Sequence, residues 1–213
     1  MKETTKAPSR SETLTLQIYN GLMEKLFSNE LAPGSIIDLK AIAEEYHVSL
    51  APVRDALQRL TLEGFIETKS RSATVVKAIT NEDIFGTLAM REALEAQAAR
   101  MVCGPTVRAN KAALLAAARQ VDSCADIIDY WKADVTFHRE FVALCKCRLL
   151  INSHANIMNI GNFYQINNYF MNHDPKMRDS HIFLVEALTT NDPDAAEAAI
   201  RKHLQAGKTA AAM

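Results

Sequence analysis

Glycine and proline are scarce in this sequence, with seven and six residues among 213. Folds rich in β-structure need these residues at their many turns, whereas the abundant Ala, Leu and Glu favour helices. Hydrophobic residues make up 48% and charged residues 23%, which are ordinary values for globular proteins. We therefore expect a folded chain of the mainly α class.

Long hydrophobic runs are also missing. No segment approaches the roughly 20 apolar residues that are needed to cross a bilayer. The polar N-terminus, MKETTKAPSRSE, lacks the apolar core of a signal peptide. These two absences predict a cytoplasmic protein that does not associate with a membrane.

Cysteines are few, and their spacing is too irregular for a disulfide framework. They lie at Cys103, Cys124, Cys145 and Cys147. The last two could form a metal-binding pair, but helical residues two apart point to different faces. Buried free thiols are the interpretation that we favour.

An excess of positive charge is missing as well, since the formal net charge is −1. Residues 1–80 hold ten Lys and Arg against ten Asp and Glu, so neither half of the chain is strongly basic. A prediction of nucleic-acid binding must therefore rest on where the basic residues lie.

Three helical patterns and a hairpin pattern follow one another in the first third of the chain. Apolar residues recur every four positions over 13–29, a short helical pattern covers 39–46, and a third helix begins near Pro52. The β-prone runs 65–68 and 73–76 flank the turn sequence KSRS. This order predicts a winged helix-turn-helix, whose third helix fits the major groove of DNA.

Four polar residues are the candidate DNA contacts of this unit. Arg54 lies one turn inside the third helix, where a guanidinium can pair with a guanine edge. Lys40 and Ser49 flank that surface and could hold phosphates, and Arg71 lies at the hairpin tip. On this pattern alone, a solvated arginine or a protein-binding winged domain remains an alternative.

The segment LKAIAEEYHVSLAPVRDALQRLTLEGFIE resembles the GntR family of regulators, whose pattern is close to L-x-x-x-A-x-x-x-x-V-S-R-x-P-V-R-x-A-L-x-x-L-x-x-x-G. The resemblance implies that Lys40, Ser49 and Arg54 contact double-stranded operator DNA. Leu50 stands where the family usually carries an arginine, and the wing tip 70–72 lacks the usual glycine pair. These departures leave the operator sequence and the affinity open.

From residue 81 onward the chain is a series of helical patterns. Asn81 is a suitable N-cap, and the expected helices cover 81–102, 106–120, 124–147, 149–171, 175–190 and 192–209. We expect residues 80–213 to form an antiparallel six-helix bundle. Residues 1–79 would form the winged helix-turn-helix with a flexible N-terminal arm.

An acid and three histidines are the candidate metal ligands of the bundle. Asp134 and His138 lie four residues apart and so share a helix face, while His181 opens one helix and His203 lies near the end of the last. Such a set suits Zn, Ni, Mn or Fe. Because a D-x-x-x-H pair is common by chance, spacing alone leaves open that these residues are unrelated.

The run MREALEAQAA, the D-x-x-x-H pair, the histidine before L-x-x-A-L-x-x-x-D and the final H-L resemble the FCD ligand-binding domain of the FadR-type GntR branch. The resemblance implies a divalent transition metal, with Zn favoured, on Asp134, His138, His181 and His203. The other histidines, His47, His154 and His173, match no ligand position and are interpreted as ordinary polar residues. The helix count resembles that of the VanR-like subgroup.

Arg91 lies where the resemblance implies an arginine that binds the carboxylate of an effector, although an ion pair with Glu95 is the alternative. The implied function is a homodimeric, ligand-responsive transcription regulator, most simply a repressor, that senses a small carboxylate or sugar acid. A metal-dependent hydrolase is one rival, but the chain has no H-E-x-x-H motif and we do not expect an enzyme. A protein-interaction module is the other rival.

Overall fold

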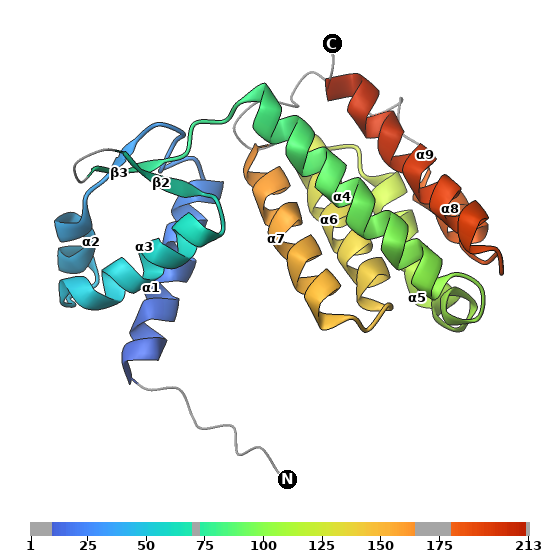
Figure 1. Cartoon of the computed structure of the whole chain (residues 1–213), viewed down its shortest axis with the longest axis horizontal. Coiled ribbons are helices and arrows are strands. Elements are labelled where there is room, and N and C mark those ends of the chain that lie inside the picture. The colour runs from blue at the N-terminus through green and yellow to red at the C-terminus, as the bar shows by residue number, and fades with distance from the viewer. Residues whose placement is uncertain (1–9, 70–72, 165–179, 212–213) are drawn as a thin grey trace, which may run out of the picture. The chain divides into compact units, whose positions relative to one another are not determined.

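Helices dominate the computed structural model of the chain (Figure 1), which describes residues 10–69, 73–164 and 180–211. The chain divides into two units, Met1–Ile79 and Thr80–Met213. The expected mainly α class is confirmed, with a winged helix-turn-helix followed by a helical bundle. The expected N-terminal arm lies largely outside the described residues.

The first unit combines three helices with a small antiparallel sheet. Its elements are α1 (Arg10–Phe27), β1 (Ile36–Ile37), α2 (Leu39–Glu45), α3 (Leu50–Leu62), β2 (Ile66–Lys69) and β3 (Ala73–Val76). The strand order is β1-β3-β2, with Ile66 opposite Val76 and Ile36 opposite Val75. The predicted hairpin is therefore present, and β1 adds a third strand that two residues are too few to reveal in a sequence pattern.

The core of this unit follows from the four-residue step along α1. Ile18, Leu22 and Leu26 are at most 1% exposed and face α3, which packs against α1. On α3 the buried side chains are Pro52, Val53, Ala56, Leu57 and Leu60. Because these residues fill one stripe of α3, its polar residues are left on the opposite face.

The second unit contains six helices within the described ranges. They are α4 (Asn81–Val102), α5 (Pro105–Ser123), α6 (Ile127–Ala143), α7 (Arg148–Tyr164), α8 (His181–Ala187) and α9 (Pro193–Ala211). Helix α4 packs against α7 and α9, and α5 packs against α6 and α8. Phe137 and Phe141 of α6 are fully buried in the shared core. In the described residues, no helix is both long enough and apolar enough to span a bilayer.

One predicted helix ends earlier than expected. The sequence pattern extended a helix to residue 147, but α6 ends at Ala143 and a turn follows in which Lys146 has a φ of 53°. Cys145 and Cys147 therefore lie in a turn, where the amide of Cys147 donates to the thiol sulfur of Cys145 at 3.4 Å. All four cysteines are free, as expected, but they are only partly buried, so the expectation of buried thiols was wrong.

The start of α4 also differs by one residue from the prediction. Thr80, not Asn81, is the N-cap: its hydroxyl accepts a hydrogen bond from the amide of Asp83 at 3.1 Å. The Asp83 carboxylate accepts in return from the amide of Thr80 at 3.2 Å. This reciprocal capping box satisfies two amides that the helix cannot pair internally.

We expect Thr80→Ala to lower the free energy of unfolding of the second unit by about 1 kcal/mol, because one N-cap hydrogen bond is lost. Trp131 in α6 is the single tryptophan of the chain and is buried, so its fluorescence reports the unfolding of this unit in urea. Thr80→Ser should retain the stability. A larger loss for Asn81→Ala than for Thr80→Ala would show that the cap is assigned to the wrong residue.

Candidate functional site

The candidate DNA-contacting residues lie on exposed parts of the first unit. Lys40 is exposed on α2, Ser49 is the exposed N-cap of α3, and Arg54 is exposed one turn into α3. The Ser49 side chain makes no capping hydrogen bond, so its hydroxyl is not used within the helix. Arg71 lies outside the described residues.

The two arginines of α3 differ in the contacts that they make within the protein. The Arg59 guanidinium lies 3.8 Å from the centre of the Tyr19 ring, and its Nε donates to Glu63 at 2.9 Å. Arg54 has no hydrogen bond or ion pair with any described residue. Arg54 is therefore the arginine of this helix that is available to an external partner.

An open groove of about 540 Å³ lies beside the turn that joins α2 to α3. Its lining residues are Lys40, Ala43, Glu44, His47, Val48 and Leu50. Leu50, the first residue of α3, gives this groove an apolar wall where the family resemblance implied an arginine. The candidate surface thus offers one free arginine beside an apolar patch rather than two arginines.

The structure brings the four candidate metal ligands together from three helices. Asp134 and His138 come from α6, His181 from α8 and His203 from α9. One nitrogen from each histidine lies within 4.8 Å of the others. The Asp134 Oδ1 lies 3.0 Å from His181 Nε2 and 3.5 Å from His138 Nε2. The residues that the sequence analysis selected therefore form one cluster.

Two imidazole nitrogens of this cluster, His138 Nε2 and His203 Nδ1, are buried and have no hydrogen-bond partner among the described residues. Burial, together with the electrostatic effect of His138 and His181, lowers the pKa of His203 to about 3, so its ring is neutral. Leaving a buried nitrogen unpaired costs free energy, which an ion bound to it would recover. Three nitrogens and one carboxylate are a donor set that fits a divalent transition metal.

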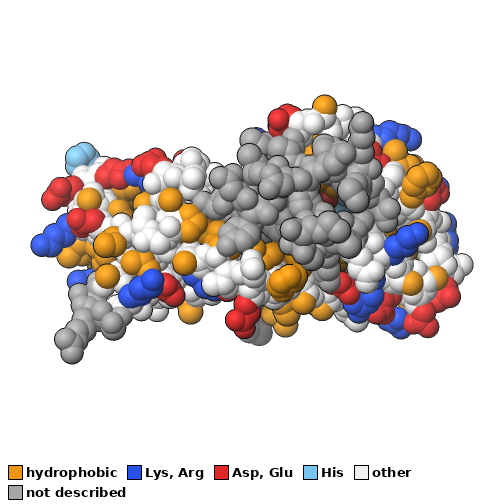
Figure 2. Space-filling view, turned by 90° about the horizontal axis from the view of Figure 1, so that it is seen from above, with side chains coloured by type: hydrophobic (Ala, Val, Ile, Leu, Met, Phe, Trp, Pro, Cys, Tyr) orange, Lys and Arg blue, Asp and Glu red, His pale blue; other side chains and the backbone are white. Residues whose placement is uncertain are grey.

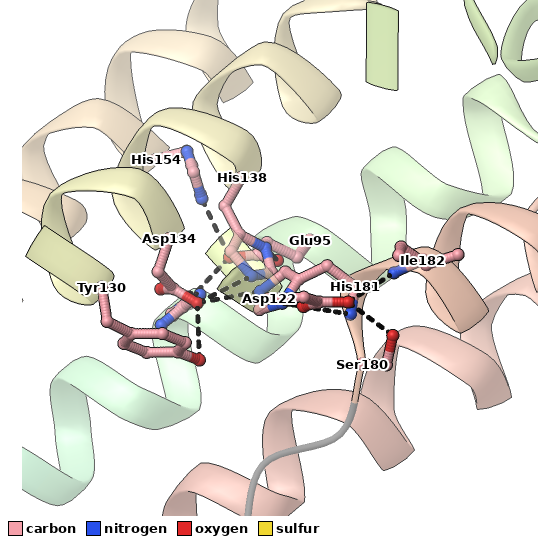
Figure 3. A network of polar contacts seen from close by, with 10 residues as sticks. Glu95, Asp122, Tyr130, Asp134, His138, His154, Ser180, His181 and Ile182 are labelled. Atoms are coloured by element: carbon pink, nitrogen blue, oxygen red, sulfur yellow. Dashed lines mark hydrogen bonds and ion pairs between the residues drawn. The ribbon is translucent and has the colours of Figure 1, made fainter. Parts of the chain in front are cut away.

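Glu95 of α4 orients His138 within the cluster (Figure 3). Its Oε2 lies 2.6 Å from His138 Nδ1, and both side chains are 0% exposed. Burial opposes the ionised carboxylate, but the close contact with His138 and the charge of Arg91 hold the pKa of Glu95 well below its usual range. A carboxylate only accepts, so Nδ1 carries the proton, and in the neutral ring the lone pair of Nε2 faces the cluster.

Asp122 of α5 orients the ring of His181 and also caps α8 (Figure 3). Its Oδ1 lies 2.9 Å from His181 Nδ1 and accepts from the His181 amide at 3.0 Å, while Oδ2 accepts from the Ile182 amide at 3.3 Å. Burial opposes the charge, but hydrogen bonds from His181 and Ser180 lower the pKa of Asp122. One carboxylate thus fixes the start of α8 and turns His181 Nε2 toward Asp134.

Arg91 makes the ion pair that the sequence analysis held as an alternative, and it also reaches the cluster. Its Nε donates to Glu95 at 2.8 Å and one terminal nitrogen, Nη2, donates to Asp134 at 3.2 Å. Burial disfavours the cation, but Glu95 and Asp134 raise the pKa of Arg91 further. The ion pair with Glu95 is compatible with the expected contact to an effector, because the guanidinium also lies beside the candidate metal ligand Asp134.

Glu95 and Asp122 were not predicted as parts of the site, and His154 was misinterpreted. The His154 side chain is 1% exposed, and its Nε2 lies 3.0 Å from Glu95 Oε1, so it is not an ordinary polar residue. Of the other two histidines, His47 is exposed and His173 lies outside the described residues. The spacing of Arg91 and Glu95, four residues apart on α4, could have indicated that Glu95 belongs to the site. No local pattern in the sequence indicated Asp122.

We expect Asp122→Asn to weaken the second unit by about 1–3 kcal/mol, because an amide replaces a partly exposed charged acceptor that receives several hydrogen bonds. Urea unfolding followed by Trp131 fluorescence measures this loss, and hydrogen exchange should show faster exchange of the His181 and Ile182 amides. Glu140→Gln, which neutralises an exposed acid of α6, should change neither. Unchanged exchange at α8 in the Asp122 variant would contradict the capping role.

Models of two protein families match the chain. The model of the bacterial regulatory proteins, gntR family, matches residues 14–76, and the FCD domain model matches residues 87–206. A winged helix-turn-helix joined to a helical FCD domain defines a transcription regulator rather than an enzyme. The chain belongs to the GntR family, in the branch that carries an FCD domain.

Curated relatives and solved structures agree with this membership. The chain is 24% identical to the HTH-type transcriptional repressor RspR of Escherichia coli K12, over 92% of this chain and 87% of RspR. It is 26% identical to a probable D-xylose utilization operon transcriptional repressor of Paenarthrobacter nicotinovorans, over 97% and 92% of the two chains.

Two solved structures share the fold. E. coli McbR/YncC matches with a TM-score of 0.68 at 21% identity, covering 93% of this chain and 97% of that one. A GntR transcriptional regulator from Rhodococcus sp. RHA1 matches with a TM-score of 0.70 at 17% identity, covering 94% and 98%. Membership of the VanR-like subgroup stays a prediction.

Proposed function

We propose that this regulator is a metal-dependent repressor that releases its operator when a small carboxylate or sugar acid binds. The observation that carries the proposal is the cluster of His138, His181 and His203 with Asp134 beside them, in which two buried nitrogens make no hydrogen bond with the described residues. A bound divalent metal would satisfy these nitrogens and keep open positions for the oxygens of an acid.

Arg91 supports an anionic effector in particular. Its Nε and Nη2 are used by Glu95 and Asp134, whereas Nη1 makes no hydrogen bond with the described residues. A guanidinium nitrogen beside a metal centre can pair with the carboxylate of a small acid. The relative named for D-xylose utilization favours an effector derived from a sugar.

Operator recognition is proposed to need two copies of the chain. Positive and negative side chains are interspersed on the face drawn in Figure 2, and the net charge is −1, so non-specific attraction to DNA is weak. A single winged unit makes few base contacts. Two recognition helices on a two-fold operator would double those contacts, which favours a homodimer.

We expect Zn to bind with about one ion per chain, because the cluster supplies four ligands. His181→Ala and His203→Ala should each lower the Zn affinity by more than about 100-fold, since a direct ligand exceeds the 10–100-fold effect of outer-shell partners. Competition titration against a chromophoric chelator measures this, with Ni, Mn and Fe as rival ions. His47→Ala, which removes an exposed histidine of the first unit, is the matched control, and equal losses in all three variants would contradict the site.

We expect Arg54→Ala to weaken specific DNA binding by about 1–3 kcal/mol, which is the value of a paired contact to a guanine edge. Gel-shift titration on a duplex selected from a random pool measures the change. Arg119→Ala removes the same charge from an exposed position of α5 and should bind normally. Metal content should be unchanged in both variants, and loss of metal together with DNA binding in Arg54→Ala would contradict the division of labour between the two units.

A further inference from the structure

We infer that Glu95 is the positioning residue of the proposed metal centre, because it selects which nitrogen of His138 faces the cluster and ties that ligand to Arg91. This inference rests on the proposed function.

Both oxygens of Glu95 are used, and they connect three helices (Figure 3). Oε2 accepts from His138 Nδ1 of α6 at 2.6 Å. Oε1 accepts from Arg91 Nε of α4 at 2.8 Å and from His154 Nε2 of α7 at 3.0 Å. With no exposed surface, this carboxylate has these donors, among the described residues, in place of the water that it loses on folding.

The contact with His138 decides whether that ring can bind a metal. A neutral imidazole carries one proton, and the nitrogen that carries it cannot be a ligand. Glu95 has no hydrogen to donate when ionised, so a proton on Nε2 would leave two lone pairs facing each other at 2.6 Å. In the neutral ring the proton is therefore held on Nδ1, and the bare nitrogen is Nε2, which lies 3.5 Å from Asp134 Oδ1 and makes no hydrogen bond with the described residues.

The contact with Arg91 makes the same carboxylate a link between the metal ligand and the arginine proposed for the effector. Arg91 is held at one nitrogen by Glu95 and at another by Asp134, itself a candidate ligand. A shift of His138 would therefore reach Arg91 through Glu95, and it would reach α7 through His154. Glutamine at position 95 would break this arrangement, because its amide can donate to Nδ1 and so permits the wrong tautomer.

The test compares Glu95→Gln with Glu92→Gln in the full chain. Glu92 lies on the same helix but binds Arg201 of α9 at 2.5 Å, so it is a matched control outside the cluster. Glu95→Gln should lower the Zn affinity by about 10–100-fold, and Glu92→Gln should leave it unchanged. In the metal-free protein, ¹⁵N NMR of the histidine rings should show the His138 proton on Nδ1 in the wild type and in Glu92→Gln. Glu95→Gln should lose that single tautomer.

Two results would overturn the inference while leaving the metal site intact: a wild-type His138 that carries its proton on Nε2, or a Glu95→Gln variant that binds Zn as tightly as the wild type. Failure of the wild type to bind Zn would instead refute the proposed function, and the NMR comparison would still decide the role of Glu95. If Glu95→Gln does not fold, as judged by Trp131 fluorescence, the wild-type spectrum alone decides the tautomer.

Discussion

A buried carboxylate is the constraint on which the second unit depends. Removing an ionised glutamate from water costs several kcal/mol unless donors replace the lost hydration. Glu95 is completely buried, and its donors come from α4, α6 and α7, so the charge is tolerated only while these helices stay in register. The same contacts orient His138. The stability of the bundle and the geometry of the candidate site therefore share one interaction.

The position of His203 has a different physical basis. Helix α9 exchanges ion pairs with α4, in which Arg100 binds Asp194 and Glu197 while Arg201 binds Glu92. These pairs are partly or largely exposed, and exposed pairs each contribute about 0–1 kcal/mol. The apolar side chains Ala196, Ile200 and Leu204 are buried on the same helix. Apolar packing therefore places His203, and the surface pairs add specificity to the alignment of α9 with α4.

Local patterns predicted the elements well, and they predicted the contacts between distant elements poorly. Periodicity of apolar residues found the three helices and the hairpin of the first unit, and the four ligand positions followed from a family resemblance. Glu95 and Asp122 were not predicted because their partners, His138 and His181, lie 43 and 59 positions away in sequence. No helical or strand periodicity extends over such distances. The burial of His154 was not predicted for the same reason. In sequence, a histidine that is buried against a distant carboxylate cannot be distinguished from any other helical histidine. The predicted N-cap of α4 was wrong by one residue, because Thr and Asn are both good N-cap residues.

Helix α4 links the candidate metal cluster to the first unit along the chain. It carries Arg91 and Glu95, and it follows directly in sequence on the DNA-binding unit, which ends at Ile79. A continuous helix of 22 residues is about 33 Å long, so unbroken helical backbone connects the region of Glu95 with the first turn of α4. The capping box of Thr80 and Asp83 keeps that first turn from fraying. If the proposed function is correct, a loosened cap should therefore weaken the effect of the effector on DNA binding more than it weakens the binding of metal.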